Sequence, residues 1–203
     1  MFADIIFPRD NEKKLINMAI RLGYSTLYFI YDFKENFDKI KEKIEELSED
    51  TGIKIKIGFK TDIKNTQKFK RFGFTVIEAT DKSRHIIEKC KPSLIYNLEL
   101  TGKKDFIHHR NSGLNQVLCK LANQHKVVVG INFNNFLKET KLRKDIIIGR
   151  IQQNIRLCRK QKVKMLIGSF ASNPYEMRNP NDLLSFCIVL GMHPKEAKES
   201  LSY

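Results

Sequence analysis

The sequence predicts an α/β fold, a TIM-barrel-like (β/α) barrel with extra helices at its C-terminal end. Short apolar runs alternate with longer amphipathic runs seven or eight times along the 203 residues. No hairpin signal joins neighbouring apolar runs, so the strands are expected to be parallel and connected by crossover helices. The chain is long enough for one barrel core, and no linker or repeat divides it. We therefore expect residues 1–203 to form a single barrel domain.

An open, doubly wound sheet is the alternative arrangement of the same strand–helix units. Sheets of that kind often bind nucleotides at a glycine-rich turn after a strand. The sequence has no G-x-G-x-x-G segment after a strand and no P-loop. The barrel is therefore the favoured arrangement.

The predicted strands are short runs of β-branched and aromatic residues. Ile53–Phe59 is the clearest, because isoleucine and lysine alternate in it, which suits a sheet edge or a strand with one face in solvent. Phe106 and Ile107 form only a weak strand before a helix. The remaining predicted strands are Ala3–Phe7, Thr26–Tyr31, Phe74–Ile77, Leu94–Tyr96, Lys126–Ile131 and Val163–Gly168.

The predicted helices repeat apolar residues at i, i+3 and i+4. Gly23 and Gly52 end the first two. Ser112 is the expected N-cap of a helix that buries Leu114, Val117, Leu118 and Leu121. The predicted helices are Glu12–Leu22, Phe33–Asp50, Ile63–Phe72, Asp81–Cys90, one after Ser112, Lys141–Gln161 and two closing helices that open at Pro180 (capped by Asn179) and Pro194.

The chain is strongly basic. Lysine and arginine number 37 against 23 acidic residues, a net charge of +14. This excess favours an anionic partner, with nucleic acid first and a membrane surface as the alternative. No apolar run approaches a membrane span, and the first residues do not resemble a signal peptide, so we expect a cytoplasmic protein. Four widely spaced cysteines predict reduced, buried thiols rather than a zinc site.

In a barrel, the residues that follow the strands gather on one rim, where barrel enzymes place their active sites. Phosphates also bind well at helix N-termini. The expected rim residues are Arg9, Asp32, Lys60, Glu78, Asn97, Glu99, His109, Arg110, Asn132, Asn134 and Ser169.

The positive charge is concentrated in two stretches. Residues 141–164 hold nine basic residues against Asp145 alone, and residues 54–71 hold seven against Asp62. In the helix predicted from Lys141, Leu142, Ile146, Ile151, Ile155 and Cys158 are expected to face the core. The residues left toward solvent are then Arg143, Arg150, Arg156 and Lys160.

Three long strings resemble one known family. They are HHRNSGLNQVLCKLA from His108, GRIQQNIRLCRK from Gly149 and SFASNPYEMRNPNDLLSFCIVLGM from Ser169. Together with GINF at 130–133, they are similar to archaeal ribonuclease P protein component 3. This family is in turn similar to the polymerase-and-histidinol-phosphatase (PHP) metallohydrolases. The resemblance therefore implies a barrel related to the PHP fold.

PHP enzymes carry an H-x-H pair at the end of the first strand, and this pair is missing. The corresponding stretch, residues 4–8, reads DIIFP, and the first histidine is His85. Only His108 and His109 adjoin the expected rim, and adjacent residues on an extended chain point in opposite directions. We therefore expect no metal or other cofactor bound by the protein. A metal-dependent phosphoesterase of the PHP type and a small-molecule phosphate binder remain the alternative functions.

The resemblance implies a non-catalytic protein subunit of ribonuclease P, the ribonucleoprotein that removes 5′ leaders from precursor tRNA. It implies that the catalytic RNA performs the magnesium-dependent reaction, and that ribonuclease P protein component 2 is the protein partner. The loop 169–178 is long for a barrel connection, so Tyr175 is a candidate for base stacking. The predicted RNA-binding residues are His109, Arg110, Asn111, Arg150, Lys160 and Arg178, with Arg84 and Lys104 as weaker candidates.

Overall fold

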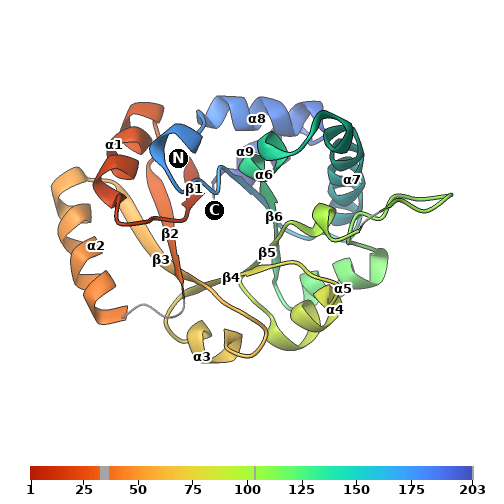
Figure 1. Cartoon of the computed structure of the whole chain (residues 1–203), viewed down its shortest axis with the longest axis horizontal. Coiled ribbons are helices and arrows are strands. Elements are labelled where there is room, and N and C mark those ends of the chain that lie inside the picture. The colour runs from red at the N-terminus through yellow and green to blue at the C-terminus, as the bar shows by residue number, and fades with distance from the viewer. Residues whose placement is uncertain (33–36, 103, 203) are drawn as a thin grey trace.

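Seven parallel strands form one sheet whose spatial order is the order in the sequence (Figure 1). The computed structural model describes residues 1–32, 37–102 and 104–202, without the side chains of residues 50, 141 and 142. The strands are β1 Ala3–Ile6, β2 Thr26–Asp32, β3 Lys54–Lys60, β4 Phe74–Glu78, β5 Leu94–Tyr96, β6 Val128–Asn132 and β7 Met165–Gly168.

Helices surround the strands, as the alternating sequence pattern predicts. Each crossover places its helix on the outside of the curved sheet. The α-helices are α1 Glu12–Leu22, α2 Phe37–Thr51, α3 Thr66–Lys70, α4 Ser83–His85, α5 Gln116–Gln124, α6 Phe133–Lys138, α7 Lys141–Lys160, α8 Pro180–Val189 and α9 Pro194–Ser200. Shorter turns are the π-helix η1 Ile86–Cys90 and the 3-10 helices η2 Leu98–Leu100 and η3 Pro174–Glu176.

The barrel is nearly closed between β1 and β7. One parallel bridge joins Ile6 to Ala171, just beyond the end of β7. Within β1, the Asp4 side chain also links this strand to the residue that follows β7. Its Oδ1 accepts the backbone N–H groups of Ile5 and Ser169, and its Oδ2 accepts the Ser169 hydroxyl. Burial raises the pKa of Asp4 to about 7, against the lowering effect of the Ser169 hydrogen bonds.

Apolar residues fill both sides of the sheet, which is typical of parallel strands under helices. The barrel interior is packed by side chains from most strands, including Ile5 and Tyr28, and by Phe170 just after β7. Three further clusters lie between the strands and the outer helices. In α7 the core-facing residues are Ile147, Ile151, Ile155 and Cys158. Ile146 is instead 38% exposed, and the Leu142 side chain lies outside the described residues.

Most predicted elements are confirmed to within a few residues. Helix α1 has the predicted bounds and ends at Gly23, whose φ of +83° suits glycine. Asn179 caps α8, and Pro180 and Pro194 open the last two helices. Of the predicted second helix, residues 33–36 lie outside the described residues.

The predicted weak strand at Phe106 and Ile107 is wrong. Both side chains are exposed, at 56% and 95%, and the segment pairs with no strand in the described part of the chain. The barrel therefore has seven strands rather than eight in the residues described.

The N-cap expected at Ser112 is also wrong. The N-cap is instead Asn115, three residues later, whose Oδ1 accepts the Leu118 N–H at 2.9 Å, and helix α5 begins at Gln116. Ser112 is buried and binds α7 instead. Val117 is 56% exposed, although the apolar spacing placed it in the core.

Strand β3 is an inner strand for part of its length and an edge for the rest. It pairs with β2 over all seven residues, whereas β4 pairs only with Gly58, Phe59 and Lys60. The alternating lysines lie mainly in the half without the second neighbour. The expectation of an edge is therefore correct for that half only.

Candidate nucleic-acid interface

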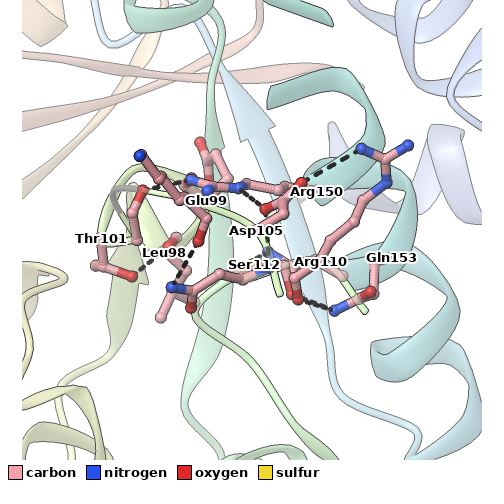
Figure 2. Close-up of polar contacts among 12 residues, drawn as sticks. Leu98, Glu99, Thr101, Asp105, Arg110, Ser112, Arg150 and Gln153 are labelled. Atoms are coloured by element: carbon pink, nitrogen blue, oxygen red, sulfur yellow. Dashed lines mark hydrogen bonds and ion pairs between the residues drawn. The ribbon is translucent and has the colours of Figure 1, made fainter. Parts of the chain in front are cut away.

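A surface loop lies against α7 and is held there by side chains of that helix (Figure 2). The loop comprises residues 101–115, apart from residue 103, and is called the Asp105 loop. It connects η2 to α5 and extends from the body of the barrel beside α7 (Figure 1). Four of the eight residues predicted to bind RNA lie in it: Lys104, His109, Arg110 and Asn111.

Arg150 of α7 anchors the beginning of the loop. Its Nε donates to Asp105 Oδ1 at 2.7 Å. Its Nη1 donates to the carbonyl oxygens of Glu99 at 2.9 Å and Gly102 at 2.7 Å. The predicted exposure of Arg150 is wrong: its side chain is only 2% exposed, because the fork of guanidinium N–H groups serves the loop.

Asp105 is the acceptor that joins the loop to the helix. Besides Arg150, it accepts the backbone N–H of Asn111 at 2.9 Å and lies 3.5 Å from Arg110 Nη1. Desolvation opposes ionisation of this carboxyl. The hydrogen bonds from Arg150 and Asn111 outweigh it and hold the pKa of Asp105 below its usual range. Asp105 is therefore ionised at neutral pH.

The next turn of α7 binds the end of the loop. Gln153 Nε2 donates to the Arg110 carbonyl oxygen at 3.0 Å and to Ser112 Oγ at 2.8 Å. Asn154 Nδ2 donates to the Ser112 carbonyl oxygen at 3.0 Å. The loop is thus fixed to α7 by both of its arms.

Gly149 allows the Arg110 side chain to lie directly on α7. A Cβ atom at position 149 would overlap the guanidinium carbon and nitrogens of Arg110. Glycine costs about 0.5–1 kcal/mol relative to alanine inside a helix. The close approach of Arg110 explains why a glycine suits this position in the helix.

The outer side of the loop is exposed and positively charged. Lys104, His108 and His109 are exposed, and the Arg110 side chain is 47% exposed. The tip turns where the Phe106 N–H donates to the His109 carbonyl oxygen at 2.9 Å. The centroids of the Phe106 and His109 rings lie 4.6 Å apart, with 31° between the ring planes, so the tip carries two neighbouring rings beside its cations.

The helix continues the positive surface away from the loop. Positions 149, 153, 156 and 160 are spaced i, i+4, i+7 and i+11, which places them on one face of a helix. Arg156 and Lys160 are exposed on this face. We call Arg110, Arg156 and Lys160 the basic stripe. The loop and α7 therefore present one line of cations.

The other predicted RNA-binding residues are less well placed. Asn111 is half-buried, and its Nδ2 donates to the Lys104 carbonyl oxygen. Arg84 is exposed but lies 3.6 Å from Glu88. Arg178 donates to the carbonyl oxygens of Tyr175 and Met177, next to η3, which packs on α1 rather than on α7. Tyr175 itself is 87% exposed.

Six of the expected rim residues do gather at the carboxyl ends of the strands. They line a cavity of about 290 Å³, and they are Arg9, Asp32, Lys60, Glu78, Asn97 and Asn132.

The other residues expected at the rim lie elsewhere in the structure. Glu99, Asn134 and Ser169 are buried inside the protein. His109 and Arg110 lie on the Asp105 loop instead of at the cavity.

The cavity does not fit the metal centre of a PHP enzyme. Within the part of the chain that the structure describes, no group of three or more histidine, cysteine, aspartate or glutamate side chains is arranged to hold a metal ion. Glu78 is already engaged by Lys60 at 3.2 Å and Asn97 at 2.8 Å. All four cysteines are buried. Across the described residues, no helix is long and apolar enough to cross a membrane.

The sequence patterns do not indicate several residues that hold the Asp105 loop of the candidate interface. Asp105, Gly149, Gln153 and Asn154 hold the loop, and none of them was singled out. A glycine inside an otherwise regular helix was the available signal for a close approach. The amides carried no signal, because their partners are about forty residues away in the chain.

The chain was compared with known families and proteins. The family model of RNase P subunit p30 matches residues 1–203. Ribonuclease P protein component 3 of Methanosarcina mazei is 33% identical over 102 residues, which make up 48% of this chain and 43% of that protein. The Methanocaldococcus jannaschii protein of the same name is 26% identical over 183 residues, or 85% and 75% of the two chains. The Methanosarcina match thus spans less than half of that relative.

Solved structures show the same fold. A chain of the cryo-EM structure of archaeal ribonuclease P with mature tRNA matches with a TM-score of 0.82 and 23% identity, covering 98% of this chain and 87% of that one. A crystal structure of an amidohydrolase matches with a TM-score of 0.56 and 9% identity, covering 99% and 72%. The barrel is therefore similar in fold to that of an amidohydrolase. From the family model and these matches, the chain belongs to the RNase P subunit p30 family.

Proposed function

We propose that this chain is a non-catalytic protein subunit of ribonuclease P that supports the catalytic RNA in the removal of 5′ leaders from precursor tRNA. Membership of the RNase P subunit p30 family supports the assignment to this ribonucleoprotein. The net charge of +14 supports an RNA partner. In this proposal the chain supplies binding energy and no proton transfer.

The single observation that carries the proposal is the basic stripe beside the Asp105 loop. Arg110 lies on α7 at Gly149, and Arg156 and Lys160 follow on the same helical face. Arginine binds phosphate through two parallel N–H groups, and lysine adds a point charge. Such a line of cations can follow the phosphates of one RNA strand.

The loop gives the stripe a fixed geometry. Arg150 is a positioning residue in this proposal, because its guanidinium holds Asp105 and two carbonyl groups rather than phosphate. His109 and Lys104 remain proposed RNA contacts at the exposed side of the loop. Arg84 remains a weaker candidate, and Asn111 and Arg178 become secondary candidates because their side chains donate to nearby carbonyl groups.

The proposed partners follow from the family. They are the catalytic RNA, ribonuclease P protein component 2 and, indirectly, precursor tRNA, and the proposed place of action is the cytoplasm. The RNA would hold the magnesium ions used for hydrolysis. Cations of this chain would screen crowded RNA phosphates, so that less magnesium is needed.

Binding to ribonuclease P RNA tests the proposal. The full chain and the double variant Arg156→Ala/Lys160→Ala would be titrated into the RNA at several salt concentrations. We expect the variant to bind about tenfold more weakly, with a salt slope smaller by about two, since each phosphate contact releases counterions.

The matched control removes two lysines elsewhere. Lys13 and Lys14 are exposed on α1, and the double variant Lys13→Ala/Lys14→Ala has the same change in net charge. It is expected to retain most of the affinity. Equal losses in both variants would mean that only the net charge matters, and the basic stripe would lose its role.

A further inference from the structure

The cavity at the carboxyl end of the barrel has a wall of aromatic rings. Phe7, Tyr96 and Phe170 all line it. The Tyr96 and Phe170 rings stack at 5.1 Å between centroids, and Phe7 lies 5.9 Å from Phe170 and 6.2 Å from Tyr96. Phe7 is the most exposed of the three. A flat, unsaturated ring is the natural partner for such a wall.

Cations stand at the edge of the same cavity. Arg9 is exposed, and its guanidinium has no partner among the described residues. Lys60 contacts Glu78 at 3.2 Å, and Lys138 contacts Glu176 at 2.8 Å. Arg9 is therefore the cation that is free to bind an anion.

Asn97 lines the cavity and carries a buried acceptor, its side-chain Oδ1, that has no hydrogen-bond donor among the described residues. Its backbone is left-handed, with a φ of +62°, and the residue is 2% exposed. Its Nδ2 donates to Glu78 Oε1 at 2.8 Å, whereas its Oδ1 has no partner among the described residues. A buried oxygen without a donor costs about 1–3 kcal/mol, so a ligand that carries an N–H group would be favoured there.

We propose that this cavity binds one nucleotide: a base against the aromatic wall, with an amino or ring N–H toward Asn97 Oδ1 and a phosphate on Arg9. The volume of about 290 Å³ is at the lower end for ligand pockets, so one nucleotide fits better than two. The nucleotide comes from a free mononucleotide or from an unpaired position of an RNA strand. The inference stands apart from the proposed function, since the cavity contains no residue of the basic stripe.

Inorganic phosphate alone does not explain the site. It would use Arg9 and leave both the aromatic wall and Asn97 Oδ1 without a role. A base and a phosphate together account for all three features. The experiment therefore has to compare a nucleoside monophosphate with its nucleoside and with inorganic phosphate.

Isothermal titration of the full chain tests the proposal. The probes are the four ribonucleoside monophosphates, the corresponding nucleosides and inorganic phosphate. We expect at least one monophosphate to bind saturably with a Kd below about 1 mM, at least about tenfold more tightly than inorganic phosphate or its own nucleoside. No saturable binding, or equal affinity for the monophosphate and inorganic phosphate, overturns the proposal.

Two variants place the binding in the cavity. Arg9→Ala is expected to weaken monophosphate binding about tenfold by removing the phosphate partner. Asn97→Gly removes the amide while keeping a residue that accepts positive φ, and is expected to weaken binding as well. Arg21→Ala, an exposed arginine on α1, is the control and should bind like the parent. If Arg9→Ala binds as tightly as the parent, the site is not this cavity.

A last comparison distinguishes the two sources of the nucleotide. The probes are 2-aminopurine ribonucleotide and a five-residue RNA with 2-aminopurine at its centre, and fluorescence quenching reports stacking. The site is assigned to an RNA strand if the affinity measured by quenching is higher for the RNA probe than for the mononucleotide probe. This quenching should also be lost in Arg9→Ala and kept in Arg21→Ala. Quenching of the mononucleotide alone assigns it to a free nucleotide. If neither probe is quenched, the proposed stacking of a base on the aromatic wall is contradicted.

Discussion

At the scale of single residues, Arg150 combines a buried charge with an anchoring role. Its guanidinium is removed from water, which is costly, and the ion pair with Asp105 and two carbonyl acceptors offset that cost. Loss of the side chain would remove one of the donors to Asp105 and the Arg150 donor to the carbonyl groups of Glu99 and Gly102. Removal of one partner of a buried pair is more harmful than replacement of both.

We predict that Arg150→Ala lowers the free energy of unfolding by about 3–5 kcal/mol. Urea denaturation measures the loss, and hydrogen exchange should show that the Asp105 loop opens first. Arg156→Ala, an exposed arginine on the same helix, is the control and should change stability by no more than about 0.5 kcal/mol. Equal stability of the two variants would mean that Arg150 does not hold the loop.

Glu99 gives the protein a pH-dependent stability. Burial raises the pKa of Glu99 to about 7, and attraction to Arg150 only partly opposes this. The folded chain therefore holds the proton more tightly than the unfolded chain, where the value is near 4.5. The stability that this proton contributes is complete below pH 4.5 and is lost as the pH rises to about 7.

Glu99→Gln should remove this dependence, because glutamine does not ionise. We predict that the variant gains about 1–3 kcal/mol relative to the parent between pH 5 and pH 8. Asp4 titrates in the same direction but is present in both proteins, so the difference isolates Glu99. Chemical denaturation at several pH values gives the two curves. Parallel curves would show that Glu99 is ionised in the folded protein near its usual pKa.

For single residues, the sequence predicted exposure better than it predicted hydrogen-bond partners. His109, Arg110 and Lys160 are exposed, as expected. Arg150 lies three residues after the buried Ile147, so the helical period places it at the border of the apolar face. Its partner Asp105 is 45 residues away in the chain. Helical periodicity alone therefore does not determine which way this side chain turns.

At the scale of elements, the Asp105 loop and α7 act as one unit. Hydrogen bonds from Arg150, Gln153 and Asn154 fix the loop along two turns of the helix. Gly149 allows Arg110 to lie flat on the same face. The position of the Arg110 cation thus depends on a residue that carries no side chain.

The variant Gly149→Ala is expected to change the position of the Arg110 side chain and the stability of α7 in different ways. Alanine should stabilise α7 by up to about 1 kcal/mol, because it is the better helix former. The added methyl group should displace the Arg110 side chain and weaken binding to ribonuclease P RNA several-fold. Thermal denaturation and RNA titration measure the two effects on one protein.

A double-mutant cycle gives the control. Arg110→Ala should lose at least as much RNA affinity as Gly149→Ala, and the combined variant should lose no more than Arg110→Ala alone. Additive losses would show that Gly149 acts on RNA binding by another route.

Elements with regular patterns were predicted well, and the loop was not. Helix α1 and strand β5 have their predicted bounds, because their patterns are long or sharply ended. Phe106 and Ile107 read as a strand from composition, yet no neighbour pairs with them among the described residues. Strand pairing is a non-local property, and two β-forming residues do not specify it.

At the scale of the whole molecule, a hydrolase-like barrel is joined to a surface of positive charge. The barrel has a fold similar to that of an amidohydrolase, and no group of three or more histidine, cysteine, aspartate or glutamate side chains in the described residues is arranged to hold a metal ion. The cations lie on the outside, along α7 and its loop. In the proposed function, the barrel is a rigid support for these cations, and the RNA performs the chemistry.

Cleavage of precursor tRNA by the reconstituted ribonucleoprotein, with and without this chain, tests that claim most directly. The rate would be measured across a range of magnesium concentrations. We predict that the chain lowers the magnesium concentration required for cleavage, and that at high magnesium the RNA with the remaining proteins cleaves nearly as well without it. Equal rates at low magnesium with and without the chain would contradict the account, as would cleavage by the chain in the absence of the RNA.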